Sequence, residues 1–342
     1  MASKHQIRGV LLEEAVLMLL RASGYRTVTD AQGDSTLGTS AAGLTVGGRG
    51  AWHQIDAIAD LLIGQPFGYP QRLLVEAKSY ADNRKIGLPI VRGSVGVLKD
   101  VSEYWVANLP NSPPVGRYHY QVAIFSSSDF TKEAQDYAFA HDIHLLPLSG
   151  SSFFVPVLQS IEAAADGLPT VGNQVVGVEL TPIRRELRRR LQPDIVVENE
   201  PLQFDWLGPV VTASRRVSRS LVATLGQAFS IFLTPDPALD LDALQTTEVV
   251  HIKFRDFANG RGWTMSRPDE TVLFTFDLPP RLFQLYADEG VLTRQTALEL
   301  KETYFSDVTA VYAIGQEIRL FRFRLNQNWV EELRATLPDQ QE

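Results

Sequence analysis

Hydrophobic positions in the first 150 residues recur with two different periods, which predict alternating helices and strands. Between residues 5 and 23 they recur every three to four positions, as in an amphipathic helix, and Gly24 follows where helices often end. Further helices are expected over about 17 residues from Pro89, and over 129–142 with Ser128 or Asp129 as the cap. Short apolar runs predict strands at 25–30, 53–62, 71–79, 118–128 and 143–148.

Two connecting segments lack a hydrophobic period. Residues 31–50 are rich in glycine, serine, threonine and alanine, so we expect a mobile loop there. The stretch GQPFGYP separates the apolar runs at 53–62 and 71–79, and its glycines and prolines are typical of a hairpin-like connection. The two runs are therefore expected to be neighbouring strands.

The pattern changes between residues 150 and 175, where we place a linker that contains a helix at about 155–165. We expect one domain at 1–150, the linker at 151–175, and an α+β domain at 176–342. In this last domain Thr181 and Pro182 are suited to the cap and first position of a helix. The strands expected after it lie at 229–235, 248–254, 271–278, 308–314 and 318–325, and a helix is expected at 294–305.

Composition narrows the class of protein. A chain of 342 residues with 44% hydrophobic and 21% charged residues is typical of a folded protein of two domains. It has no cysteine, which excludes disulfides, thiolate nucleophiles and the common zinc sites, and which fits a reducing compartment. Glu13 and Glu14 interrupt the apolar N-terminal stretch, so it does not resemble a signal peptide. We expect a cytoplasmic protein without a membrane partner.

The strand expected at 71–79 carries two charges on one face. Glu76 and Lys78 are two positions apart, and side chains at that spacing point to the same side of a strand. Buried charges are costly unless they are paired or hold a metal. The triplet alone is weak, because Glu299 and Lys301 repeat it within a helical pattern. Its meaning therefore depends on its surroundings.

Asp56 is the residue that gives the triplet a context, because it lies in the apolar strand expected at 53–62, just before the strand that carries Glu76 and Lys78. Adjacent antiparallel strands could bring Asp56 beside Glu76, and two converging carboxylates suit a hard divalent cation such as Mg²⁺ or Mn²⁺. A lysine beside such a cation can orient or deprotonate water, and the metal lowers the pKa of that water. The pattern indicates hydrolysis of a phosphodiester.

These residues resemble those of the PD-(D/E)xK nuclease superfamily, and within it the Mrr-like restriction endonucleases. The resemblance runs from about residue 8 to 148 and rests on five blocks in order: EEAVLMLLRASGY, HQIDAIAD, LLVEAKSY, IGLPIVRGSVGVLKD and FSSSDFTKEAQDYAFAHDIHLLPL. Two positions depart from the pattern. Ile55 stands where the signature has proline, and many Mrr relatives have glutamine where this chain has Glu76.

The resemblance implies an α/β restriction-endonuclease-like fold, with a mixed central sheet flanked by helices, followed here by the C-terminal α+β domain. It implies that Asp56, Glu76 and Lys78 are catalytic, and that Asp56, Glu76 and Glu13 hold Mg²⁺ or Mn²⁺. By the same resemblance, the protein would cut DNA in restriction or antiviral defence, as a homodimer or larger oligomer. The C-terminal domain would gate it, with a defence-system protein as one possible partner.

Several alternatives remain open. Asp56, Glu76 and Lys78 could form a buried ion-pair network in a non-catalytic nucleic-acid-binding or assembly protein, or belong to a repair or junction-resolving nuclease. Glu14 is the alternative to Glu13 as the ligand on the first helix. Gln54 could contact the substrate, or be an ordinary polar residue at the start of a strand. The six histidines show no arrangement typical of a metal site.

A cluster of arginines stands out in a chain whose net charge is −8. That net charge argues against binding nucleic acid by bulk electrostatics. On the helix expected at 181–191, however, arginines four positions apart form two rows on one face, which could contact phosphates. The alternative is a solvated helix, or one that contacts the acidic remainder of the protein. The candidate nucleic-acid contacts are Arg184, Arg185, Arg188 and Arg189.

Overall fold

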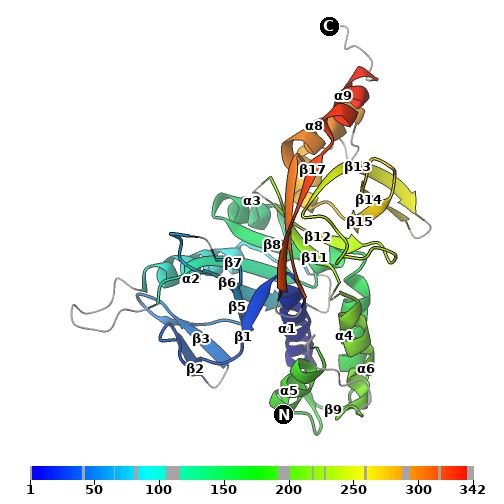
Figure 1. Ribbon diagram of the computed structural model, residues 1–342. Coiled ribbons are helices and arrows are strands. Elements are labelled where there is room, and N and C mark those ends of the chain that lie inside the picture. The colour runs from blue at the N-terminus through cyan, green and yellow to red at the C-terminus, as the bar shows by residue number, and fades with distance from the viewer. Residues whose placement is uncertain are drawn as a thin grey trace. The chain divides into compact units, whose positions relative to one another are not determined.

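A five-stranded mixed sheet, in the order β1-β5-β6-β7-β8, carries the candidate catalytic residues (Figure 1). The first three strands run antiparallel to their neighbours, and β6, β7 and β8 are parallel. This arrangement confirms the expectation of a mixed sheet. The strands are β1 (Tyr25–Val28), β5 (Ala57–Leu61), β6 (Gln71–Lys78), β7 (His119–Ser126) and β8 (Ile143–Pro147).

The computed structural model describes residues 2–40, 43–64, 66–80, 84–104, 116–191, 201–217, 219–226, 229–257, 260–286, 293–314 and 317–336. Its contacts divide the chain into two compact units. One comprises Met1–Ser218 with Ala313–Gln316, and the other comprises Arg219–Tyr312 with Glu317–Glu342. We describe each unit by itself.

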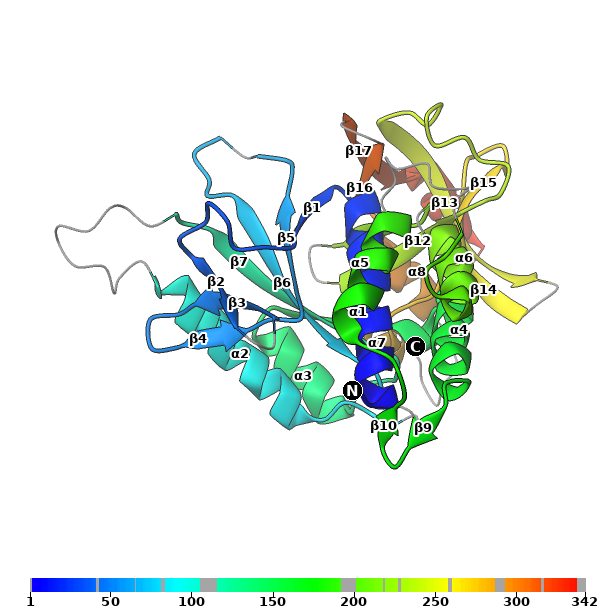
Figure 2. The ribbon, with the colours of Figure 1, turned by 90° about the horizontal axis from the view of Figure 1, so that it is seen from below.

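Helices cover both faces of the sheet in the first unit (Figure 2). Helix α1 (Lys4–Ala22) packs on β1, β5 and β6, whereas α2 (Leu88–Ser102) and α3 (Lys132–Ala140) lie on the other side against β7 and β8. On that second side, Val91 and Val95 of α2 share an apolar core with Leu74 of β6 and Val122 of β7. The even-numbered residues of β6 therefore face α2.

Two helices begin at different residues from those expected. Thr131 caps α3, because its hydroxyl accepts a hydrogen bond from the Ala134 amide at 3.3 Å, whereas Asp129 pairs with Lys85. Helix α5 (Leu180–Arg190) begins after Glu179, so Thr181 lies inside its first turn. In both cases the apolar pattern located the helix correctly, and the choice between neighbouring polar residues as cap was wrong.

The expectation of a loop at 31–50 was also wrong. Three short strands form a separate sheet there, namely β2 (Leu37–Ser40), β3 (Gly43–Gly47) and β4 (Trp52–Gln54). Ser40 pairs with Gly43, which has a φ of 134° that other residues rarely adopt. Leu37 and Val46 are buried in the same apolar core as Val91 and Val95 of α2. The glycines that suggested a loop instead allow a tight hairpin.

Among the described residues, helices α4 (Val155–Asp166), α5 and α6 (Gly208–Val217) also belong to the first unit, so it extends well past residue 150. Helix α4 packs on α1 through its buried face, which includes Val157 and Ile161, where a linker was expected. Helix α5 also contacts α1, and α6 contacts α4. A small hairpin of β9 (Thr170–Val171) and β10 (Gln174–Val175) lies between α4 and α5 along the chain.

The second unit is a closed barrel in the order β11-β12-β15-β14-β13-β17-β16. Its core is rich in aromatic side chains, including Phe274, Phe321 and Phe323. The sequence indicated an α+β domain but gave no sign of closure. Its strands are β11 (Leu221–Leu225), β12 (Phe229–Pro235), β13 (Thr247–Phe257), β14 (Gly260–Ser266), β15 (Val272–Phe276), β16 (Asp307–Ile314) and β17 (Glu317–Leu325), and its helices are α7 (Pro280–Tyr286), α8 (Arg294–Tyr304) and α9 (Gln327–Ala335).

Among the helices that the structure describes, none is both long and apolar enough to cross a membrane.

Candidate active site

Asp56 lies beside Glu76, as the sequence predicted. It occupies the short break between β4, which ends at Gln54, and β5, which begins at Ala57. The antiparallel register pairs Ala57 with Val75, so the residue before Ala57 falls next to the residue after Val75. The Asp56 carboxylate accepts a hydrogen bond from the Ala77 amide, with 2.9 Å between Oδ2 and N. This bond ties Asp56 to the backbone of β6.

Glu76 and Lys78 form a direct ion pair on one face of β6. Their side chains are 28% and 25% exposed, so both are shielded from solvent but accessible to a ligand. The strand context explains the pairing, because residues two apart on a strand point the same way. The second Glu-x-Lys triplet, at Glu299 and Lys301, lies on α8, where the same spacing places the two side chains on different sides of a helix.

The charges at this site influence one another. Burial, together with the negative charge of Asp56, raises the pKa of Glu76, and Lys78 opposes that rise. Burial alone would lower the pKa of Lys78, but the Glu76 carboxylate outweighs it, and the pKa of Lys78 is raised. Lys78 therefore carries its proton at neutral pH and contributes a positive charge beside two carboxylates.

Glu13, on α1, lies close enough to Asp56 for their charges to interact. Its carboxylate contacts the Arg184 guanidinium of α5, with 2.5 Å between Oε2 and Nη2. Burial raises the pKa of Glu13 to about 7; Arg184 opposes this rise, and the charge of Asp56 adds to it. Asp56 thus acts electrostatically on both Glu13 and Glu76, although the two glutamates belong to different elements.

Most of the arginines expected to contact nucleic acid are held by carboxylates of the first unit. Arg188 donates a hydrogen bond to the fully buried Glu14, with 2.9 Å between Nε and Oε1. Arg189 pairs with Glu186 three residues before it. Arg185 is exposed on α5. The sequence could not reveal the pairs with α1, because their partners lie about 170 positions apart along the chain.

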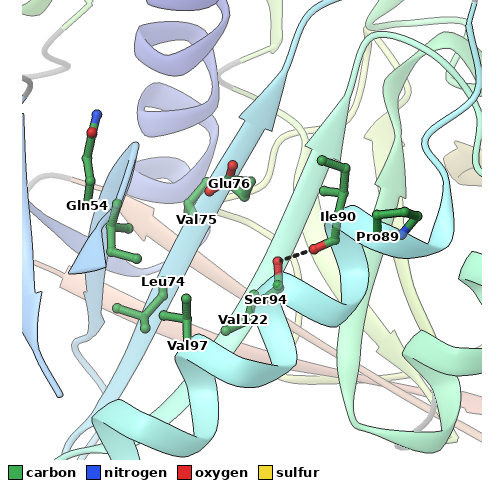
Figure 3. A pocket seen from close by; sticks show the side chains of 11 residues that line it. Gln54, Leu74, Val75, Glu76, Pro89, Ile90, Ser94, Val97 and Val122 are labelled. Carbon is green, nitrogen blue, oxygen red and sulfur yellow. Dashed lines mark hydrogen bonds between the residues drawn. The ribbon is translucent and has the colours of Figure 1, made fainter. Parts of the chain in front are cut away.

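A pocket of about 300 Å³ opens beside Glu76 (Figure 3). Its floor includes Leu74 and Val122 of the sheet, and its side wall is α2. Gln54, at the end of β4, also lines it, so the structure places Gln54 near Glu76. The contribution of α2 to the site was not predicted from the sequence, although Ile90, Gly93 and Val97 recur there at helical spacing.

The donor atoms fit a hard divalent cation in kind, since Asp56, Glu76 and Glu13 offer only carboxylate oxygens. Within the residues that the structure describes, however, no three histidine or acidic side chains lie close enough together to hold a metal ion. The arrangement explains this, because Glu13 contacts Arg184 and Glu76 contacts Lys78. Of these three described carboxylates, Asp56, just before β5, and Glu76, on β6, lie side by side.

No protein-family model and no curated protein matches this sequence. Among solved structures, the chain is similar to a protein of unknown function, AF1548, with 17% identity and a TM-score of 0.34, over 61% of this chain and 97% of the other. It is also similar to AspBHI, a DNA modification-dependent restriction endonuclease, with 15% identity and a TM-score of 0.26, over 48% of this chain and 39% of the other.

Proposed function

We propose that this protein is a metal-dependent endonuclease that hydrolyses phosphodiester bonds of DNA. The observation that supports this most is the placement of Asp56 beside Glu76 across β5 and β6, with Lys78 paired on the same strand. Two carboxylates and an ammonium group within one half-buried site are the groups that such a hydrolysis needs. The resemblance of the sequence blocks to Mrr-like nucleases agrees with this proposal.

Each residue has a distinct part in the proposed mechanism. Asp56 and Glu76 would hold Mg²⁺ or Mn²⁺, which would lower the pKa of a bound water and neutralise charge on the phosphate. Lys78, which keeps its proton, would stabilise the negative charge that builds on the phosphoryl oxygens. The Ala77 amide would keep the Asp56 carboxylate in a fixed position. Glu13 could act as a further ligand only after separating from Arg184.

The wider role follows from the resemblance. We propose restriction or antiviral defence as the setting, and gating of the nuclease by the barrel unit, with a homodimer or a defence-system partner as the active assembly. A repair or junction-resolving nuclease would use the same three residues. Branched DNA is therefore the substrate that separates these two roles.

One observation favours a second candidate, a nucleic-acid-binding or assembly protein without catalysis. Glu13 and Glu76 each already contact a protein cation, and the described residues contain no group of three metal-binding side chains. In that case the site would be a structural network. Paired charges of this kind persist in a fold without any metal.

The test is cleavage of plasmid and branched DNA with Mg²⁺ or Mn²⁺. We expect wild-type protein to cut, and Asp56→Asn, Glu76→Gln and Lys78→Met each to lower the rate by about two orders of magnitude or more. Glu299→Gln is the matched control, because it alters the second Glu-x-Lys triplet on α8, and it should cut like wild type. Titration of Mn²⁺ by calorimetry gives a second measurement, in which Asp56→Asn should bind more weakly.

Two results would contradict the proposal. Equal cleavage by wild type and all three site variants would place the activity elsewhere. Binding of DNA without cleavage under either metal, together with no measurable binding of Mn²⁺, would favour the non-catalytic candidate.

A further inference from the structure

The pocket beside Glu76 belongs to the candidate active site but has no part in the mechanism above. Its walls are largely aliphatic, with Leu74 and Val122 on the sheet and Ile90 and Val97 on α2 (Figure 3). Glu76 is the charged residue of its lining. A ligand in this pocket would therefore have an apolar body and would lie next to the proposed metal site.

The sequence of α2 accounts for the space. Val91 and Val95 point into the core and hold the helix on the sheet. The adjacent face of the helix carries Gly93 between Ile90 and Val97, and a Cβ atom at Gly93 would meet no atom within 4 Å. Gly93 is exposed as well as part of the lining, so it lies at the solvent side of the pocket. A larger side chain there would meet no protein atom and would narrow the entrance.

The volume suits a small ligand. About 300 Å³ is at the small end of the range for ligand pockets, about 300–1,000 Å³. A nucleobase suits such a pocket, since its flat faces are apolar and its edge needs hydrogen-bond partners. One polar group of the lining, the Ser94 hydroxyl, is suited to such an edge. The Ser94 hydroxyl donates to the Ile90 carbonyl at 3.2 Å, so its oxygen can accept.

The connection to the proposed reaction is Glu76 itself. A phosphate cut beside Glu76 belongs to a nucleotide whose base is joined to it through one sugar, so that base or its neighbour lies within reach of the same pocket. We propose that the pocket receives one unstacked nucleobase of the DNA strand that is cut at the site of Asp56, Glu76 and Lys78. This inference rests on the proposed function, and it names the form of the substrate.

A base can enter only if it has left its stack and its pair. Extruding a base costs free energy, and the cost is lowest for single-stranded, mismatched or damaged nucleotides. The protein should accordingly prefer single-stranded or locally unpaired DNA over a fully paired duplex of the same sequence.

Substitutions on α2 test the pocket without altering the carboxylates. Gly93→Leu would place a large side chain at the entrance of the pocket, and Gly93→Ala a small one. Gly96→Leu is the matched control, because Gly96 lies on the same helix, is exposed like Gly93, also has no atom within 4 Å of its Cβ position, and does not line the pocket. All three changes replace a helical glycine by a residue of higher helix propensity, so the helix should form in each variant. Circular dichroism and thermal unfolding verify this.

The measurement is the fluorescence of 2-aminopurine, which increases when this base leaves its stack. Oligodeoxynucleotides carrying 2-aminopurine at successive positions are titrated in Ca²⁺, and cleavage of the same strands is followed in Mg²⁺. We expect a fluorescence increase with wild type and Gly96→Leu, a smaller increase with Gly93→Ala, and none with Gly93→Leu. We also expect kcat/KM for cleavage to fall on the order of tenfold or more in Gly93→Leu only.

The outcomes separate this inference from the proposed function. Cleavage by wild type together with equal fluorescence and equal rates in Gly93→Leu and Gly96→Leu would overturn the base pocket and leave the nuclease intact. A fluorescence increase that Gly93→Leu abolishes, without cleavage by any protein, would support the pocket and contradict the nuclease. Failure of every protein to bind DNA would overturn both.

Discussion

The guanidinium of Arg184 on α5 contacts the buried carboxylate of Glu13 on α1, with 2.5 Å between the two atoms. In the proposed mechanism this carboxylate is a candidate metal ligand, so Arg184 now occupies the place that a cation would take. One positive charge can replace another there, because a buried carboxylate needs a cationic partner of some kind. Metal binding by Glu13 would therefore compete with the ion pair.

The first prediction concerns this competition. Arg184→Gln should lower the free energy of unfolding by about 2 kcal/mol without metal, because it leaves Glu13 buried and unpaired. Millimolar Mg²⁺ or Mn²⁺ should restore part of that loss if Glu13 is a ligand. Urea unfolding of wild type and variant, each with and without metal, measures both effects.

Arg188→Gln is the control for this experiment. Arg188 pairs with Glu14, which lies next to Glu13 and is 1% exposed, so its loss should also destabilise the protein. If Glu13 is the metal ligand, Glu14 is not expected to bind metal. Metal should therefore not restore the stability of the Arg188→Gln variant. Equal rescue of both variants, or of neither, would contradict the assignment of Glu13 as the ligand.

The second prediction concerns a buried arginine on β6, the strand that also carries Glu76. The Arg72 side chain on β6 is 1% exposed and pairs with Asp60 and Asp34, at 2.7 Å in each case. Its guanidinium also lies 3.5 Å from the centre of the Tyr118 ring. Arg72→Met would leave the buried Asp60 without its main partner, and should cost about 3–5 kcal/mol of unfolding free energy.

Arg26→Met gives the comparison for Arg72. Arg26 also pairs with Asp60, but its side chain is 69% exposed, so its loss should cost less than about 1 kcal/mol. Chemical denaturation of both variants measures the difference. A similar cost for the two would show that burial does not set the strength of these pairs.

The third prediction concerns Lys301 in the barrel unit. Burial, with a smaller contribution from the charge of Lys253, lowers the pKa of Lys301 from 10.5 to about 8. The unfolded chain keeps this proton up to a higher pH than the folded chain does, so stability should rise as pH increases from about 8 to about 10. Below pH 8 Lys301 is charged in the folded chain, and the cost of burying that charge lowers the free energy of unfolding by its full amount.

Lys301→Met should therefore stabilise the barrel unit at pH 7, by about 3 kcal/mol at most, since each pKa unit corresponds to about 1.4 kcal/mol. The contact of the ammonium group with the Trp329 ring, at 5.0 Å, offsets part of this gain. Denaturation of wild type and variant between pH 7 and pH 10.5 measures the difference, which should shrink as pH rises. A constant difference across this range would contradict the lowered pKa.

Sequence patterns were sufficient where one element carries its own signal. The helical period of α1 and the apolar runs of β6 and β7 located these elements, and the antiparallel neighbours brought Asp56 to Glu76 as expected. These features depend on local periodicity and on pairing between adjacent strands. Such elements can be predicted even where the residue that caps a helix, such as Thr131, cannot.

Features that depend on distant parts of the chain were not predictable. The arginines of α5 looked suited to phosphates, and only folding shows that Arg184 and Arg188 meet Glu13 and Glu14 of α1. The hairpin of β2 and β3 was missed for a different reason, because its glycines carry no side-chain pattern. The pocket beside Glu76 was also missed, since its lining comes from residues 54–55, from β6, from α2 and from β7, which are far apart along the chain.

The way in which the barrel closes has a consequence for how the chain is made. Strand β17 pairs in parallel with β13 and lies next to β16, so it completes the ring although it comes last of the seven strands along the chain. On the ribosome, β11 to β16 must wait with two unpaired edges until residue 325 has emerged, and exposed edges invite pairing with other chains. The sheet that carries Asp56 and Glu76 needs no strand beyond β8 and can form long before. The candidate catalytic strands would then be assembled on the nascent chain before the barrel that we propose as their gate.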